Sequence, residues 1–142
     1  MPKRFSGGCH CGNIRFELLG PETPRVLFCN CSICVKKQNH HFIIPIDQFR
    51  LVRGHTSMTT YTFGTNQAKH NFCPICGVES FYIPRSNPDG VAINIYCLDE
   101  GQLGNFERVD FDGINWEQTM ASKAAEMKSY SKSKPGPKVR TF

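Results

Sequence analysis

Along most of the chain, hydrophobic and polar residues alternate in short stretches that are separated by turn-forming residues. At residues 14–18, for example, three apolar side chains alternate with Arg15 and Glu17, a period of two that predicts a strand with one buried face. Further short strands are predicted at 41–46, 49–53, 58–63, 78–83, 91–96 and 106–111. The second and third of these are expected to be joined through Gly54 and His55. This spacing favours a mainly β fold over alternating strand–helix units.

One helix is predicted near the C-terminus, at residues 116–130, where alanine and methionine recur. Asn115 is the expected N-cap. The last residues, 129–142, are rich in Ser, Lys, Pro and Gly and are expected to form a solvated tail. We therefore expect one β-rich domain over 1–120, followed over 121–142 by the end of the helix and a basic, flexible tail.

Composition supports a single packed domain. The chain has 142 residues, of which 39% are hydrophobic and 11 are Phe, enough for a core, so global disorder is excluded. No apolar run reaches the roughly 18–20 residues of a membrane span, and no secretory signal is visible. We expect no membrane partner and a cytoplasmic location, with the nucleus as an alternative.

The formal net charge of +5 is not spread evenly. Residues 1–120 carry 11 Lys and Arg against 11 Asp and Glu, whereas residues 121–142 carry 6 against 1. The excess positive charge therefore belongs to the last 22 residues. We expect no nucleic-acid partner for the domain and allow for weak contact through the tail.

The eight cysteines change the picture most. In a reducing compartment cysteines more often bind metal or take part in chemistry than form disulfides. Seven of them fall into three tight groups, which are Cys9 with Cys11, then Cys29 with Cys31 and Cys34, then Cys73 with Cys76. Cys97 stands alone after a predicted strand and is expected to be a small apolar core residue.

The two glycine-flanked pairs predict one closed zinc site. Zinc takes four ligands in a tetrahedron, and a Cys-x-x-Cys turn or a Cys-x-Cys segment can direct two sulfurs at one ion. The simplest set of four is Cys9, Cys11, Cys73 and Cys76. A closed four-thiolate site is structural. The alternative is reduced core cysteines or disulfides.

The remaining group, Cys29, Cys31 and Cys34, supplies only three ligands. Three protein ligands leave one zinc position open, which is how catalytic sites differ from structural ones. Alternatively a fourth protein ligand closes a second structural site. The candidates for that ligand are His40, His41, His70 and Cys97. Spacing alone leaves both interpretations open.

These motifs carry a resemblance to a known family. Gly-Gly-Cys-His-Cys-Gly at 7–12, Cys-Asn-Cys-Ser-Ile-Cys at 29–34 and His-Asn-Phe-Cys-Pro-Ile-Cys-Gly at 70–77 resemble the glutathione-dependent formaldehyde-activating enzyme (GFA) family. The later stretches 80–100 and 111–117 are similar to its centromere protein V branch. The resemblance covers roughly residues 5–120.

The resemblance implies a β-tent fold of small antiparallel sheets stapled by zinc. It implies two zinc ions per chain, a structural one on Cys9, Cys11, Cys73 and Cys76 and a labile, catalytic one on Cys29, Cys31 and Cys34. It also implies carbon–sulfur lyase chemistry that joins formaldehyde to glutathione, giving S-hydroxymethylglutathione. The partners would be a small thiol and an aldehyde. The alternative is a non-catalytic, zinc-stabilised module, associated with chromatin or the cytoskeleton, that uses its basic tail.

Glutathione carries two carboxylates, so cationic side chains are expected to bind it. The candidates, which the sequence does not rank, are Arg15, Lys36, Lys37, Arg53 and Arg85. No residue is identified from sequence as a general base. Neither the physiological substrate nor the oligomeric state is predicted.

Overall fold

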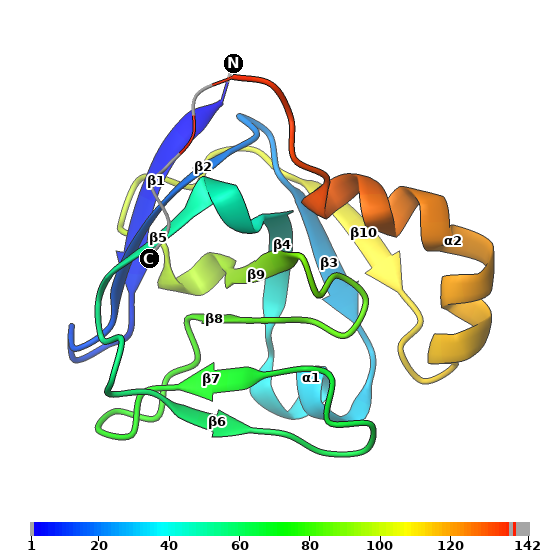
Figure 1. Ribbon diagram of the computed structural model, residues 1–142, viewed down its shortest axis with the longest axis horizontal. Coiled ribbons are helices and arrows are strands. Elements are labelled where there is room, and N and C mark those ends of the chain that lie inside the picture. The colour runs from blue at the N-terminus through cyan, green and yellow to red at the C-terminus, as the bar shows by residue number, and fades with distance from the viewer. Residues whose placement is uncertain (1, 137, 139–142) are drawn as a thin grey trace.

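Three small sheets and a C-terminal helix make up the computed structural model, which describes residues 2–136 and 138 (Figure 1). The strands are β1 (Lys3–Gly8), β2 (Arg15–Gly20), β3 (Arg25–Cys29), β4 (His40–Pro45), β5 (Phe49–Arg53), β6 (Thr59–Tyr61), β7 (His70–Phe72), β8 (Phe81–Tyr82), β9 (Gly90–Asn94) and β10 (Glu107–Phe111). The helices are α1 (Ser32–Lys37), the 3-10 turns η1 (Ile46–Gln48) and η2 (Ile95–Cys97), and α2 (Trp116–Ser131). The expected mainly β fold with one C-terminal helix is confirmed.

The three sheets have different roles in the molecule. An antiparallel sheet in the order β1-β2-β5 forms one wall, and a five-stranded sheet in the order β10-β3-β4-β9-β8 forms the other. The pair β6-β7 forms a separate two-stranded sheet at the bottom of Figure 1. Every pair is antiparallel except β10 with β3, whose parallel register ends with Phe111 opposite Cys29.

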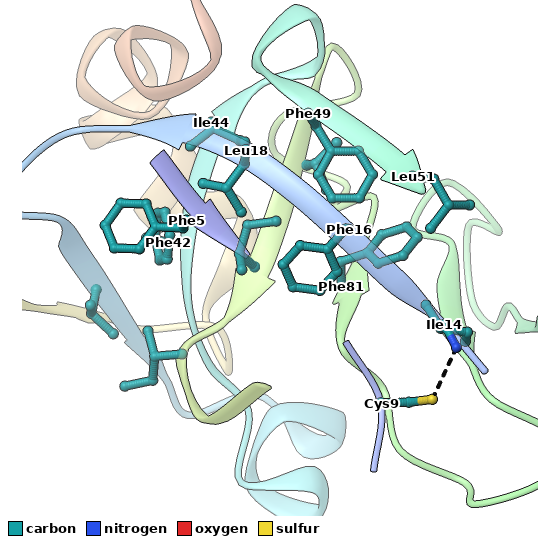
Figure 2. Packing of buried hydrophobic residues seen from close by; sticks show 14 of the residues in the cluster. Phe5, Cys9, Ile14, Phe16, Leu18, Phe42, Ile44, Phe49, Leu51 and Phe81 are labelled. Atoms are coloured by element: carbon teal, nitrogen blue, oxygen red, sulfur yellow. Dashed lines mark hydrogen bonds between the residues drawn. The ribbon is translucent and has the colours of Figure 1, made fainter. Parts of the chain in front are cut away.

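The main core contains the apolar faces of the three-stranded and five-stranded sheets. Five phenylalanines are buried in it and contact one another, with ring centroids 4.8–6.1 Å apart (Figure 2). These are Phe5, Phe16, Phe42, Phe49 and Phe81. Burying one such ring stabilises the fold by about 1.5–3 kcal/mol, so this cluster holds the two sheets together.

A second, smaller core lies between the five-stranded sheet and α2. It contains Leu27, Ile43, Tyr82, Ala92, Phe111 and Met127. The helix is fixed there by Asn87, whose side-chain amide donates to the carbonyl of Met127 over 2.6 Å. As a result, α2 and β10 lie along the same edge of the molecule (Figure 1).

Most predicted elements are present, with corrections. The strands predicted at 14–18, 41–46, 49–53 and 106–111 and the helix at 116–130 correspond to β2, β4, β5, β10 and α2. The strand predicted at 58–63 shrinks to β6 and pairs with β7 rather than with β5. The strands predicted at 78–83 and 91–96 shorten to β8 and β9. Asn115 precedes α2, but its side chain makes no capping bond to the helix; it donates instead to Asp112.

Three strands and a helix were missed, namely β1, β3, β7 and α1, as were the two 3-10 turns. Of the predicted tail, residues 129–131 are helical. Beyond them, Ser133 donates to the carboxylate of Asp47, and the ammonium of Lys138 lies 3.2 Å from the same group. The rest of the tail prediction falls partly on residues 137 and 139–142, outside the described residues. Among the described helices, none has the length and apolar character of a membrane span.

Candidate metal centres and the adjoining cavity

The first cysteine cluster joins two distant segments of the chain. Cys9 and Cys11 follow β1, and Cys73 and Cys76 follow β7. All four sulfurs lie within 4.8 Å of one another. The Sγ atoms of Cys9 and Cys11 are 3.7 Å apart and those of Cys11 and Cys73 are 3.6 Å apart. A tetrahedron with Zn–S bonds of about 2.3 Å has edges of about 3.8 Å, so this donor set fits zinc.

Backbone turns position these sulfurs. The amide of Gly77 donates to the carbonyl of Cys73 over 2.7 Å, and Gly77 has φ +76°, a left-handed conformation that favours glycine. On the other side, the amide of Ile14 donates to the Sγ of Cys9 over 3.2 Å (Figure 2). An N–H directed at sulfur stabilises a thiolate, which is the form that binds metal.

The second cluster comes from one short segment. Cys29 ends β3, Cys31 lies just before α1, and Cys34 is within α1; their three sulfurs also lie within 4.8 Å of one another. Hydrogen bonds from the thiols of Cys29 and Cys34 lower the pKa of Cys31 to about 2, and backbone N–H groups of Cys34 and Ile33 at the start of α1 act in the same direction. The cluster is thus arranged to hold at least one thiolate.

The loop between β10 and α2 passes directly over this cluster. A Cβ placed on Gly113 would lie 2.5 Å from the Sγ of Cys29 and 2.7 Å from the Cβ of Cys31. Such distances leave no room for a side chain. The amide of Asn30 donates to the carbonyl of Phe111 over 3.3 Å, and the side-chain oxygen of Asn30 accepts from the amide of Ile114. The loop is therefore held against the cluster by hydrogen bonds to the backbone and side chain of Asn30.

A cavity of about 510 Å³ adjoins the three sulfurs. Its wall combines the three cysteines with mainly apolar side chains from β3, β10, α2 and the 63–68 loop. The apolar members include Leu27, Ile33, Phe63, Ala68, Phe111, Ile114, Trp116 and Met127. None of the four cysteines of the first cluster lines it. The second cluster is thus the one that faces a space large enough for a ligand.

Buried polar groups complete the cavity. His41, His70 and Tyr82 line it, and all three are more than nine-tenths buried. The Nε2 of His41 lies 3.2 Å from the Tyr82 hydroxyl. Burial lowers the pKa of His41 to about 4 and raises that of Tyr82 well above its usual value, so both are neutral at pH 7.

His70 is stacked on Tyr82, with ring centroids 5.1 Å apart, and its Nδ1 lies 3.7 Å from a carboxylate oxygen of buried Glu79. The other oxygen of Glu79 accepts from the ammonium of Lys37. Neither ring nitrogen of His70 has a hydrogen-bond partner among the described residues. His70 therefore presents uncommitted polar atoms at a buried position beside the cavity.

The candidate fourth ligands lie in different places. Among the described residues, no further histidine, cysteine or carboxylate ligand atom groups with the sulfurs of Cys29, Cys31 and Cys34. His41 and His70 line the same cavity, whereas His40 stacks on Phe28 at 3.9 Å, outside the cavity lining. Cys97 lies at the end of η2, where burial raises its pKa to about 12.

The five cationic side chains considered for glutathione binding differ in their location. Lys36 and Lys37 line a second cavity of about 900 Å³, between α1 and the β6-β7 sheet. Arg85 lines the 510 Å³ cavity, with its guanidinium stacked 3.6 Å from the Trp116 ring centroid and bonded to Glu117. Arg15 forms a two-pronged pair with Asp99, over 2.8 and 2.6 Å. Neither Arg15 nor Arg53 lines either cavity.

Sequence reasoning did not single out four residues of this region. They are Glu79, Tyr82, Gly113 and Trp116. Each lies 40 or more residues from the cysteine segment that it faces. The chain's only Trp and a glycine within the 111–117 stretch were the available signals.

This combination of small sheets, two thiol clusters and one adjoining cavity defines a mainly β protein whose cysteines can bind metal. The chain belongs to the glutathione-dependent formaldehyde-activating enzyme (GFA) family, because the family's model matches residues 4–110. All seven clustered cysteines lie within the matched region.

A solved structure supports the same assignment. The chain is similar to a Rhodobacter sphaeroides protein of known crystal structure, with 33% sequence identity and a TM-score of 0.62. The match covers 73% of this chain and 99% of that one. About a quarter of this chain lies outside the match.

Proposed function

We propose that the protein is a zinc-dependent enzyme of the carbon–sulfur lyase class that adds a glutathione thiol to formaldehyde or reverses the addition. In the forward direction the thiol sulfur forms a bond to the carbonyl carbon. The π electron pair moves to the oxygen, and the thiol proton ends on that oxygen, giving S-hydroxymethylglutathione. The reaction needs no oxidant, reductant or further reactant.

One observation carries the proposal: three sulfurs, with no fourth protein ligand grouped among the described residues, line a cavity of ligand size. Cys29, Cys31 and Cys34 would hold the catalytic zinc, and Cys9, Cys11, Cys73 and Cys76 a structural one. Bound zinc would supply a thiolate at neutral pH or polarise a carbonyl oxygen. Family membership supports the substrate pair.

Neighbouring side chains would orient the reactants and handle the proton. The neutral Tyr82 hydroxyl, buried beside His41, can donate a hydrogen bond to the oxygen that gains charge. His70, whose ring nitrogens make no hydrogen bond among the described residues and whose Nδ1 faces Glu79, can accept a proton at one nitrogen and return it to the product oxygen. The sequence had offered no candidate for this role.

For the glutathione carboxylates we propose the 900 Å³ cavity. Lys37 is already paired with Glu79, whereas Lys36 has no hydrogen bond or ion pair among the described residues. Lys36 is therefore the cation best placed to receive a carboxylate. Ser32 and Ile33 line both cavities, so a thiol peptide in one can direct its sulfur towards the other.

The test is an exchange experiment. With ¹³C-formaldehyde and glutathione, NMR exchange spectroscopy should show that the zinc-loaded protein speeds adduct formation and breakdown beyond the spontaneous rate. Cys31→Ser should return the rate to background. Cys97→Ala, which removes a thiol outside both clusters, should retain it. Equal rates with and without wild-type protein would reject the enzyme and favour the interaction module, which would then bind nucleic acid or tubulin through its tail.

Three finer predictions belong with this proposal. The resemblance of residues 80–100 and 111–117 supports placement in the centromere protein V branch. Chemistry on reduced thiols supports a cytoplasmic location, with the nucleus as an alternative. The proposed division remains a zinc-binding domain over 1–120, followed over 121–142 by the end of the helix and a basic tail, with Met127 of that helix in the smaller core.

A further inference from the structure

The cavity beside Cys29, Cys31 and Cys34 is much larger than formaldehyde requires. A water molecule takes about 30 Å³ of liquid volume, so a molecule with two heavy atoms needs on the order of 60 Å³. The cavity measures about 510 Å³. Cavities of 300–1,000 Å³ typically hold ligands of drug size. Most of this space would remain unused by a one-carbon aldehyde.

The wall away from the sulfurs is mainly apolar, and the one charged side chain of the lining, Arg85, lies against the Trp116 ring. Leu27, Phe111 and Met127 are each at most 5% exposed and belong to the smaller core. Trp116 and Ile114 extend this surface towards solvent, where Ile114 is 72% exposed. Contact between this wall and a hydrocarbon group is favourable in free energy, because it removes apolar surface from water.

The peptide part of the thiol need not fill this space. The neighbouring 900 Å³ cavity offers Lys36, which suits a peptide carboxylate, whereas Lys37 beside it is paired with Glu79. The two cavities share Ser32, Ile33 and Phe63, at the start of α1 and on the 63–68 loop. The site thus has a cationic compartment and an apolar compartment that meet beside the cysteine segment.

Part of the apolar wall also comes from outside the region that defines the family. The family model matches residues 4–110, whereas Ile114, Trp116 and Met127 follow it. The three cysteines and Leu27 belong to the matched region, whereas Phe111 and the segment that follows it, Gly113 included, lie beyond it. Substrate preference can therefore differ here while the chemistry is retained.

We propose that the aldehyde partner of this protein carries an apolar carbon chain or ring, which occupies the 510 Å³ cavity. This inference rests on the proposed function and names its substrate class. The thiol sulfur bonds to the carbonyl carbon of R–CHO, the π pair moves to oxygen, and the thiol proton ends there. The product is R–CH(OH)–S–glutathione, in which R lies against Phe111, Trp116 and Met127.

Binding can be measured without turnover, because Trp116 is the chain's only tryptophan and lines the cavity. The probes are S-methylglutathione and S-hexylglutathione, titrated against the zinc-loaded protein by tryptophan fluorescence. We expect S-hexylglutathione to shift the emission and bind at least tenfold more tightly, because buried methylene groups favour binding. Equal dissociation constants would overturn the proposal.

A cavity-filling variant tests the location. Ala68 lines the cavity, so Ala68→Leu should reduce the preference for S-hexylglutathione over S-methylglutathione at least fivefold. Ala121→Leu adds the same side chain at an exposed position of α2 and should leave the ratio unchanged. An unchanged ratio in Ala68→Leu, with a native circular dichroism spectrum, would place the hexyl group elsewhere.

Exchange kinetics then separate this inference from the proposed function. With glutathione, hexanal should be processed at least tenfold more efficiently than formaldehyde, each rate corrected for the spontaneous reaction. If formaldehyde is processed as efficiently as hexanal, or more efficiently, the proposed substrate class is wrong and the proposed function stands. No acceleration with either aldehyde would reject the proposed function, and tight S-hexylglutathione binding would then show a binding site without catalysis.

Discussion

The two cysteine clusters offer the same kind of ligand, a cysteine sulfur, but differ in the number of ligands and in how far apart these lie in the sequence. Cys9, Cys11, Cys73 and Cys76 come from two segments about 60 residues apart and form a group of four. Cys29, Cys31 and Cys34 come from six consecutive residues and form a group of three beside a cavity. A metal in the first would close a long loop, whereas a metal in the second would add little to the chain's connectivity. We propose that this difference separates a stabilising role from a chemical one.

The largest effect is expected from breaking the four-cysteine cluster. Cys73 is fully buried, and Cys73→Ser removes one of four ligands. Structural zinc contributes folding free energy on the order of 10 kcal/mol, comparable to the whole stability of a domain. We expect loss of soluble, folded protein, measured by circular dichroism and gel filtration. Cys97→Ser is the matched control. A cooperative thermal transition near the wild-type temperature in Cys73→Ser would refute the structural role.

The corresponding change in the three-cysteine cluster should spare the fold. Cys31→Ser is expected to keep the unfolding temperature within a few degrees while the zinc content falls from about two ions per chain to about one. Metal analysis by mass spectrometry and thermal unfolding measure the two quantities on one sample. If Cys31→Ser unfolds the protein, the second cluster is structural as well.

Removal of metal should proceed in two phases. With three protein ligands and a cavity beside them, the three-cysteine cluster leaves a metal position that a chelator can occupy. The four-cysteine cluster leaves no such position, although Cys11 is exposed, so it should release its metal more slowly. We expect a fast and a slow phase of zinc release, followed with a colorimetric zinc indicator. Cys31→Ser should retain only the slow phase. Persistence of the fast phase in that variant would assign it to the other cluster.

A smaller effect is expected from the loop above the three sulfurs. In Gly113→Ala the added Cβ would lie 2.5 Å from the Sγ of Cys29, so the loop or the cysteine must shift. We expect at least tenfold weaker zinc binding at this cluster and a loss of about 1–3 kcal/mol of stability. Gly104→Ala is the control, because a Cβ there has nothing within 4 Å. Equal zinc affinity in both variants would contradict the close packing.

The smallest effect is expected beside the four-cysteine cluster. Hydrogen bonds from Arg15, and then from Ser6, lower the pKa of Asp99 to about 2, below its usual 3.8. A lowered folded pKa stabilises the fold above pH 3.8, and this contribution is lost as the pH falls towards 2. Because Asp99 is more than a third exposed, Asp99→Asn should cost only about 1 kcal/mol. Urea unfolding should give the same difference at pH 7 and pH 5; a change between them would contradict this assignment.

Sequence patterns predicted the parts of the fold that have their own local period. The alternation at 14–18 and the alanine-rich stretch at 116–130 predicted β2 and α2. Strands β3 and β7 were missed because neither alternates apolar and polar residues; each is defined by its partners across a sheet. The pairing of β6 with β7 could not be predicted either, since all three residues of β6 are exposed.

The division of the cysteines followed from spacing, because ligand pairs at i and i+2 or i+3 are local features. The cavity was not predictable in the same way. Tyr82, Trp116 and Gly113 reach the three-cysteine cluster only through the assembly of the five-stranded sheet, in which β8 pairs with β9 and β10 with β3, and through the packing of α2 on that sheet. Their positions depend on the whole fold.

The parallel pairing of β3 with β10 sets an order of completion during synthesis. All four ligands of the first cluster lie at or before residue 76, whereas the strand and loop that cover the second cluster, 107–116, are synthesised only after it. A nascent or truncated chain can therefore bring its four-cysteine cluster together while Cys29, Cys31 and Cys34 remain uncovered. Residues 107–116 would thus complete the proposed reaction site.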